Sequence, residues 1–352
     1  MRYFCWVVIA LLFLIRYETV RPKYKDGDKV RILAKITSEP IRSTSYQKTS
    51  LAGVTIFLPV FPEIYYGDKV LVEGRVKDGK ITQPEKFEII KEADFLSIVR
   101  KKLLDFYKKS FPEPHSSLVA GVVVGSKDTT SAFFESLKAT GTMHVVVASG
   151  MNVTLVAGFL INSLVMFINR KKAIPAALVG IWIYSLVSGF NAPIIRAAIM
   201  GSIALFAQEA GRIYHSLRTL FLTGLVMLFI NPLWIADLGF ILSFLATTSL
   251  ILFTKAFERR LYFIPALIRE GFVTSLAAQI GVTPLMFLTF GQLNIVSPLI
   301  NALVLWVVPL ITIIGMFSGI LALAFPVMGK LLLYLSYPLT TWFITIIDLF
   351  SF

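Results

Sequence analysis

The sequence predicts a polytopic α-helical membrane protein of about nine to ten spans, some broken or re-entrant, with a small inserted β-barrel of the OB type. The first observation is composition, because 56% of the 352 residues are hydrophobic and only 16% are charged. A single soluble core built from this chain would leave long apolar faces exposed to water, because there are too few charged residues to cover them. The second is distribution: residues 21–115 hold 19 Lys/Arg and 13 Asp/Glu, whereas the longer stretch 116–352 holds 13 and 7. A water-soluble insert therefore precedes a membrane-embedded segment.

This uneven composition divides the chain into an N-terminal membrane anchor (1–20), a β-domain (21–92), an amphipathic helix with an interfacial linker (93–143) and a transmembrane module (144–352). The anchor is an apolar run from Tyr3 to Ile15 between two arginines, which is short for a spanning helix. A signal peptide has a similar pattern, but no small-residue cleavage site follows, so we expect an uncleaved anchor. Either interpretation exports the β-domain.

The β-domain is predicted from short segments of alternating character. Residues 28–37 and 68–77 mix β-branched residues with alternating charge, and a Gly-Asp-Lys-Val turn enters each segment. A third strand is expected at 54–58, and residues 77–80 form a hairpin turn that leads to a strand at 87–90. Several short strands in so little sequence suit a small OB-like barrel.

Lysine and tyrosine side chains give this domain a candidate DNA-contact surface. Lys48 would attract phosphates, and Tyr46, Tyr65 and Tyr66 would stack on the bases of single-stranded DNA. A β-domain without a ligand, or an assembly platform, is compatible with the same residues.

A basic amphipathic helix is expected between Ala93 and Phe111. Apolar residues recur there at three- and four-residue spacing, while Arg100 and four lysines are assigned to the opposite side. Such a helix either lies on lipid headgroups or leads DNA toward the membrane, and the first interpretation is favoured.

Apolar segments from residue 144 onward predict nine spans, at 145–168, 173–190, 194–210, 217–232, 237–254, 271–290, 295–308, 309–326 and 331–350. Pro193, Pro284, Pro298 and Pro309 interrupt these stretches. Broken helices are tolerated in a bilayer only where the freed backbone faces protein or a wet cavity, so the pattern favours a pore or a transport site.

The cations between the spans predict an orientation. The connections near residues 170, 212 and 260 are basic, and those near 190, 235 and 292 carry few cations. Because basic connections stay in the cytoplasm, the β-domain is predicted to be extracytoplasmic in a multi-pass membrane protein.

Polar residues at the start of the first span are functional candidates because polar groups are costly in lipid. His144, Ser149 and Asn152, with Gly150 between the last two, form a stripe that would line a substrate path. An intramembrane serine protease is disfavoured, since no histidine on a second helix can activate Ser149. In a structural alternative, Ser149 and Asn152 bridge helices and Gly150 is a packing notch.

Three further polar residues raise the same question. Arg196 follows a connection that contains glycine and proline, and it either snorkels to the interface or holds an anion such as phosphate. Gln279 is a second path candidate. Asp237 either faces the path or caps the helix that follows Pro232.

Residues 141–153, Gly-Thr-Met-His-Val-Val-Val-Ala-Ser-Gly-Met-Asn-Val, resemble the signature of ComEC-type competence proteins, the bacterial inner-membrane DNA-uptake channel family. Other motifs match in the family's order: Gly125, 193–200, Arg212, 231–232, 237–244, Gln279, Pro284, 290–293 and Asn301. The resemblance implies that the β-domain is the family's OB-like extracytoplasmic domain and that residues 144–352 are its membrane competence module.

The sequence departs from this family in two ways. The family's second histidine is Asn152 here, and the metal motifs of the metallo-β-lactamase-like domain found in many relatives do not occur. The resemblance thus implies a channel form without that nuclease-like domain and without enzymatic activity. A single cysteine, Cys5, and three histidines also exclude a structural zinc site, and no metal or cofactor is expected.

These observations together predict a channel that moves single-stranded DNA inward during natural transformation. The expected partners are single-stranded DNA, the lipid bilayer and other competence-machinery proteins, and a homo-oligomer is compatible with the sequence. Two alternatives from other classes remain: a transporter of small-molecule or lipid-linked substrates, and a structural membrane component of a competence or pilus complex.

Overall fold

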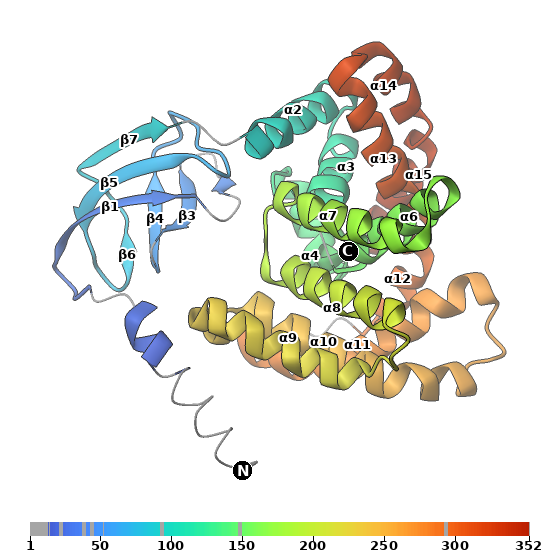
Figure 1. The fold of residues 1–352 in the computed structure, drawn as a ribbon. Coiled ribbons are helices and arrows are strands. Elements are labelled where there is room, and N and C mark those ends of the chain that lie inside the picture. The colour runs from blue at the N-terminus through green and yellow to red at the C-terminus, as the bar shows by residue number, and fades with distance from the viewer. Residues whose placement is uncertain are drawn as a thin grey trace, which may run out of the picture.

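The computed structural model describes residues 13, 15–20, 24–36, 40–42, 46–51, 53–91, 95–146, 150–291 and 295–351. Within these residues the protein is mostly helical, and the strands all lie between Lys29 and Lys91. Figure 1 shows the β-domain beside a larger helical module, with α2 (Phe95–Ser110) as the first helix after it. Most of the anchor predicted for residues 1–20 lies outside the described residues, although residues 15–20 are helical.

The β-domain consists of two sheets. The first is antiparallel, with β5 (Lys69–Arg75) between β1 (Lys29–Lys35) and β7 (Lys86–Lys91). The second has the order β2-β3-β4-β6, with bounds Ile41–Arg42, Gln47–Leu51, Val54–Leu58 and Lys80–Ile81. The four strands that the sequence predicts are therefore present. Among the described residues no strand pairing joins the two sheets, so a closed barrel is not shown.

Burial alternates along the strands, as expected when one face of each sheet packs on a core. In β3 and β4 every second residue is buried. The core contains Ile36, Leu51, Ile56, Ile64, Val70, Val72 and Ile81, each no more than 1% exposed. The predicted hairpin turn is also present, because Asp78 and Gly79 both have positive φ and Lys77 and Lys80 exchange two backbone hydrogen bonds of 2.9 Å.

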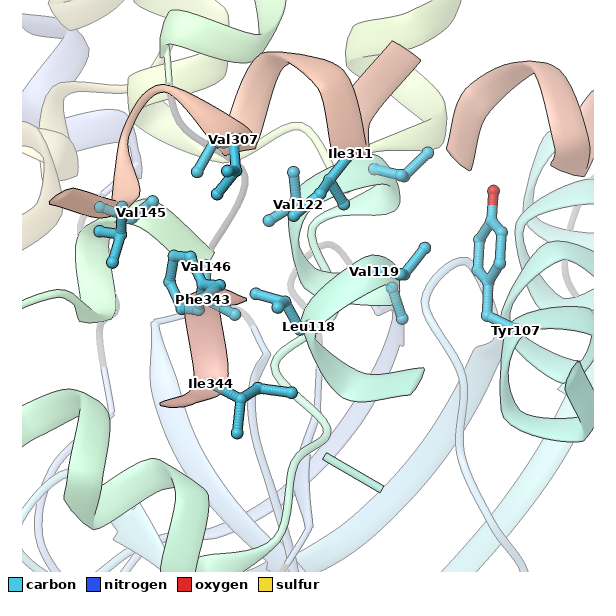
Figure 2. Packing of buried hydrophobic residues seen from close by; sticks show 14 of the residues in the cluster. Tyr107, Leu118, Val119, Val122, Val145, Val146, Val307, Ile311, Phe343 and Ile344 are labelled. Carbon is cyan, nitrogen blue, oxygen red and sulfur yellow. The ribbon is translucent and has the colours of Figure 1, made fainter. Parts of the chain in front are cut away.

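Helix α2 packs against other helices. Its buried residues include some that lie outside the apolar side predicted from the sequence. Leu103 and Tyr107 are buried against α3 (His115–Val124) and α13 (Val307–Ala324), while Phe95 is 76% exposed. Figure 2 shows Tyr107 beside the valines and leucine of α3 in this cluster. Burial raises the pKa of Tyr107 far above its usual value, so its hydroxyl stays protonated and donates to the Gly315 carbonyl at 2.9 Å.

After α4 (Ser131–Ala139) and α5 (Met143–Val146), helices occupy most of the apolar segments that the sequence predicts as spans. Its helices are α6 (Gly150–Phe167), α7 (Arg170–Val187), α8 (Ala192–Glu209), α9 (Ser216–Ile230), η1 (Pro232–Ala236), α10 (Leu238–Arg260), α11 (Ala266–Phe290), α12 (Ser297–Val304), α13, α14 (Pro326–Tyr334) and α15 (Tyr337–Phe350). Among the described residues, the helical segments Met143–Phe167, Leu238–Arg260, Ile268–Thr289 and Val307–Ala324 are long and apolar enough to cross a membrane. The pair α14 and α15, bent by 50°, counts as a fifth candidate if it is one span.

Three predicted spans differ from the structure. The segment 295–308 contains the eight-residue α12 and the first two residues of α13, and 331–350 begins inside α14 and continues through the bend into α15. The interruption expected at Pro284 is wrong, because α11 continues through this proline. A proline inside a membrane helix removes one backbone donor, which neighbouring groups can compensate. Pro193 and Pro298 instead lie in the first turns of α8 and α12, where the missing N–H costs nothing.

The helical module has two ends of different character. In Figure 1 the connections α6–α7, α8–α9 and α10–α11 lie on the right, whereas the β-domain and the start of α8 lie on the left. The three connections on the right are the basic ones of the sequence. The β-domain thus lies at the end of the module away from the basic connections.

The close packing of α2 on α13 predicts that one methyl group added to Gly319 lowers the stability of the protein. In Gly319→Ala the new Cβ would lie 2.9 Å from Leu103 Cδ2 and closer still to the Tyr107 hydroxyl. We expect a loss of about 1–3 kcal/mol of stability from overpacking, measured by thermal unfolding in detergent. Gly201→Ala on α8 is the control, since nothing lies within 4 Å of its Cβ. Equal stability of both variants would contradict the described packing of α2.

Candidate functional site

The candidate site is built around the C-terminal end of α3. Three successive carbonyl oxygens there accept side-chain donors from three other helices. The Val122 carbonyl accepts from Asn152 Nδ2 of α6 at 2.7 Å, and the Val123 carbonyl accepts from the Tyr184 hydroxyl of α7 at 3.1 Å. The Val124 carbonyl accepts from the guanidinium of Arg100 on α2. We call the three donors Arg100, Asn152 and Tyr184 the α3 cap.

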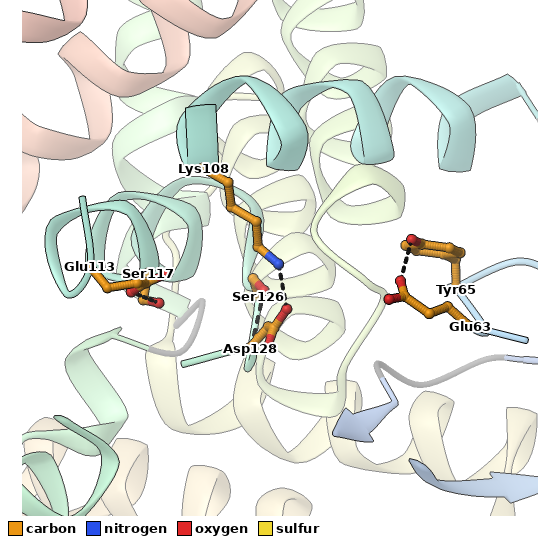
Figure 3. A network of polar contacts seen from close by, with 7 residues as sticks. All are labelled: Glu63, Tyr65, Lys108, Glu113, Ser117, Ser126 and Asp128. Atoms are coloured by element: carbon orange, nitrogen blue, oxygen red, sulfur yellow. Dashed lines mark hydrogen bonds and ion pairs between the residues drawn. The ribbon is translucent and has the colours of Figure 1, made fainter. Parts of the chain in front are cut away.

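The backbone satisfies the preceding carbonyls of α3. Gly125 has a φ of +70°, and its N–H and that of Ser126 donate to the carbonyls of Gly121 and Ala120. The next residues are fixed by Asp128, whose N–H donates to Ser126 Oγ at 3.2 Å and whose carboxylate pairs with Lys108 at 2.6 Å (Figure 3). The end of α3 is therefore buried with its carbonyl groups paired.

Arg100 lies between two helix ends. Its guanidinium also donates to the carbonyl of Val187, the last residue of α7, and the side chain is 2% exposed. The C-terminal ends of helices carry partial negative charge, so two of them stabilise one buried cation. The face of the guanidinium lies 5.7 Å from the Tyr66 ring of the β-domain. Arg100 thus contacts the β-domain, α3 and α7 at once.

Polar atoms near the α3 cap have no hydrogen-bond partner within the described residues. They are Asn152 Oδ1, Ser188 Oγ and Asn191 Nδ2. Ser188 and Asn191 flank Gly189, which has a φ of +94° and whose Cβ position would be 3.7 Å from the Arg100 guanidinium. Buried polar atoms of this kind normally find water or a ligand as a partner.

Arg196 is a second cation that packs inside the helical module. Its guanidinium donates to the backbone carbonyl and the hydroxyl of Ser243 on α10. A Cβ added to Gly150 would lie 2.8 Å from Arg196 Nη2 and 3.2 Å from Ala197 Cβ. Gly150 therefore lets α6 pass directly against Arg196, as a packing notch would.

The remaining residues of the predicted stripe are separated by the structure. Ser149 lies outside the described residues. His144 is on α5, exposed, and its Nδ1 donates to the Gly141 carbonyl at 3.0 Å. Asn152 bridges α6 and α3, which is the contact that the structural alternative expected, while its Oδ1 stays unpaired within the described residues.

The two other candidates of the module lie further along the chain. Asp237 is exposed and caps α10, with Oδ1 accepting from the Phe240 N–H at 2.7 Å, as its position before a helix predicts. Gln279 is half-buried on α11, a helix that packs on α10 and α12.

On the β-domain, Tyr46 and Lys48 lie at an aromatic groove of about 530 Å³. The Tyr46 ring packs edge-on against Phe57 at 5.2 Å, and Lys48 Nζ is 5.8 Å from the same ring. Phe61, 73% exposed, is part of the lining together with Phe87 and three prolines. The loop that carries Phe61 is held by Gln47, whose amide donates to the carbonyls of residues 59, 60 and 62 and accepts from the Ile64 N–H.

Tyr65 and Tyr66 face α2 and not this groove. Lys101 Nζ lies 3.9 Å from the centre of the Tyr65 ring, and the Tyr65 hydroxyl donates to Glu63 at 2.6 Å (Figure 3). The four β-domain candidates therefore form two pairs, one at the groove and one at the junction with α2.

Sequence reasoning missed Arg100, Tyr184 and Ser243. The assignment of Arg100 to the solvent side of its helix was wrong, because it precedes Leu103 and Tyr107 by three and seven residues and shares their buried row. That spacing was the available signal. Tyr184 and Ser243 lie within apolar spans, where no local pattern distinguishes a capping residue from a packing residue.

Comparison with known proteins shows the family of the chain. The profile of the competence protein family matches residues 122–352, which is more than half of the chain. The chain belongs to the competence protein family. It is 27% identical over 248 residues to ComE operon protein 3 of Bacillus subtilis (strain 168), and the match covers 69% of this chain and 30% of that protein.

A second relative is an uncharacterized protein of Aquifex aeolicus (strain VF5). It is 35% identical over 185 residues, which is 52% of this chain and 41% of the relative. The chain therefore aligns with less than half of the length of both curated relatives. No solved structure matches. The resemblance noted in the sequence is confirmed, and the chain is a membrane protein of this family.

The α3 cap predicts that Arg100 stabilises the module more than its neighbours on α2. Arg100→Met removes a charged donor from two buried carbonyls, and we expect a loss of about 3 kcal/mol in thermal unfolding in detergent. Lys102→Met, exposed on the same helix, should change stability by less than about 0.5 kcal/mol. Arg100→Lys should also destabilise, since one ammonium group cannot reproduce the fork of the guanidinium. Wild-type stability of Arg100→Met would show that the two carbonyls do not depend on it.

Proposed function

We propose that the protein is an inner-membrane channel that carries single-stranded DNA inward during natural transformation, and that it has no enzymatic step of its own. Its family is one of competence proteins, which implies a role in DNA uptake. The finer assignment, a path for one DNA strand, is supported chiefly by Arg196.

Arg196 supplies a positive charge that no acidic group neutralises within the described residues. Its guanidinium lies beside Gly150, the first described residue of α6. A guanidinium that no described carboxylate neutralises suits a phosphate group that passes through. The Ser243 contacts hold the guanidinium without removing its charge.

The polar atoms around the α3 cap support a water-filled path beside Arg196. A polyanion crossing a bilayer needs water and a few polar groups that bind weakly enough to release it. Asn152, Ser188 and Asn191 offer such groups close to Arg100, which contacts Tyr66 of the β-domain. In this proposal His144, Ser149, Gly150, Asp237 and Gln279 lie along the same route.

The β-domain would receive the strand at its aromatic groove. We propose that it is an OB-like barrel, with bases stacking on Tyr46, Phe57 and Phe61 and phosphates near Lys48. Tyr65 and Tyr66, which contact α2, would then hold the domain against the module.

The orientation follows from the charged connections. Basic connections stay in the cytoplasm, and the β-domain lies at the opposite end of the module, so we propose that it is extracytoplasmic. In the same proposal α7, α8 and α9 also span the membrane, and α12 is a half-helix. With the N-terminal anchor, and with α12 counted or not, this gives the nine to ten membrane passages expected from the sequence.

Other competence-machinery proteins and a second copy of the chain are the proposed protein partners. The two other functions, a transporter of small-molecule or lipid-linked substrates and a structural component of a competence or pilus complex, fit the same fold. An uptake assay separates all three, because only the channel requires Arg196 for the movement of DNA.

Arg196→Gln tests the channel in a strain that lacks its own copy. Glutamine keeps a donor for Ser243 and removes the charge, so we expect normal protein abundance and about a tenfold to hundredfold loss of labelled DNA uptake, as for a lost charge-assisted hydrogen bond. Lys330→Gln, exposed on α14, is the matched control. Full uptake by Arg196→Gln at normal abundance would remove this residue from the path and with it the main support for the channel.

Phe61→Ala tests the groove in the purified full chain. Because one stacked base contributes about 1–3 kcal/mol, we expect weaker binding of a single-stranded oligonucleotide by that amount, with strong salt dependence for wild type and variant. Phe95→Ala is the control, since Phe95 is equally exposed but lies on α2. Equal affinities of both variants would favour an assembly platform.

A further inference from the structure

Three connections at the end of the module away from the β-domain have the same make-up. They lie at residues 166–172 (α6–α7), 209–218 (α8–α9) and 255–270 (α10–α11), on the right of Figure 1. Each combines exposed apolar side chains with exposed cations. We call these three connections the cationic rim.

The apolar side chains of the rim lie at or beyond the helix ends. Phe167 is 84% exposed, Ile213 82% and Phe263 71%, and Met166 and Tyr262 are similar. A water-facing tip of a connection is normally polar, because exposed apolar area is unfavourable. At the headgroup level of a bilayer the same side chains are favoured, aromatic ones especially.

The cations of the rim carry unbalanced charge. They are Arg170, Lys171, Lys172, Arg212, Arg218, Lys255, Arg259, Arg260 and Arg269. Within the described residues none of the nine forms an ion pair. Only three carboxylates, Glu209, Glu258 and Glu270, lie in the same stretches, so the rim has a net charge of +6.

We propose that the cationic rim binds the headgroups of anionic phospholipids and that the protein is stabilised by an anionic leaflet. Cations attract the lipid phosphates while the neighbouring apolar tips enter the headgroup layer. A single-stranded nucleic acid could stack its bases on Phe167 and Phe263 but would leave Ile213 and Met166 in water, so the lipid surface accounts for all of these side chains and for the cations. This inference goes beyond DNA transport and does not depend on it.

The test uses the full chain in nanodiscs of phosphatidylcholine, with and without phosphatidylglycerol. We expect a higher unfolding midpoint with the anionic lipid, and a smaller difference at high salt. The variant Arg212→Gln, Arg259→Gln, Arg260→Gln should lose most of this difference. The variant Lys77→Gln, Lys80→Gln, Lys91→Gln, with the same charge change on the β-domain, should keep it.

A second measurement needs no variant. Wild-type protein extracted from vesicles of both lipids should carry phosphatidylglycerol enriched several-fold over the starting mixture, as measured by mass spectrometry of the bound lipid. Equal midpoints in the two nanodiscs, a difference that survives the rim substitutions, or no enrichment would each overturn the proposal. A rim-dependent shift produced by single-stranded oligonucleotide in neutral nanodiscs, in place of the lipid effect, would assign the rim to nucleic acid instead and would also overturn it.

Discussion

A helix that ends inside an apolar environment needs hydrogen-bond donors for its last carbonyl groups. The C-terminal end of α3 has this requirement, and the surrounding helices meet it. Val122, Val123 and Val124 are each no more than 2% exposed, so bulk water cannot serve their carbonyls. The donors come from α6, α7 and α2. Because each of these helices supplies one donor, the end of α3 fixes four helices relative to one another, and Arg100 adds the β-domain through Tyr66.

The same constraint explains how the module holds its two arginines. Arg100 is met by the negative ends of α3 and α7, so it acts as part of the scaffold. Arg196 donates to a carbonyl and a hydroxyl of Ser243 and lies beside Gly150. Its surroundings orient the guanidinium but supply no full negative charge within the described residues. We therefore propose that Arg100 has a structural role and that Arg196 contacts an anion.

Local pattern accounts for most of the fold. The charge boundary near residue 115 and the alternation in β1, β4, β5 and β7 predicted the two parts, and long apolar runs predicted α6 to α11. The shortness of α12, the bend before α15 and the continuity of α11 through Pro284 depend on packing partners distant in sequence, which no local run contains. For the site, Arg196 and Asn152 were predicted because polar groups are rare in apolar segments. Arg100 was missed because it stands among lysines that do face water.

The account depends on water or substrate reaching the polar atoms beside the α3 cap, and thiol accessibility at Ser188 measures this directly. In a Cys5→Ala background, Ser188→Cys should react with a small water-soluble thiol reagent and react more slowly when single-stranded DNA is present. Ser318→Cys is the reference, because Ser318 is equally buried and its hydroxyl donates to the Gly315 carbonyl in the α2–α13 contact. Labelling at Ser188 no faster than at Ser318, and unchanged by DNA, would show a dry packing core where we place the path.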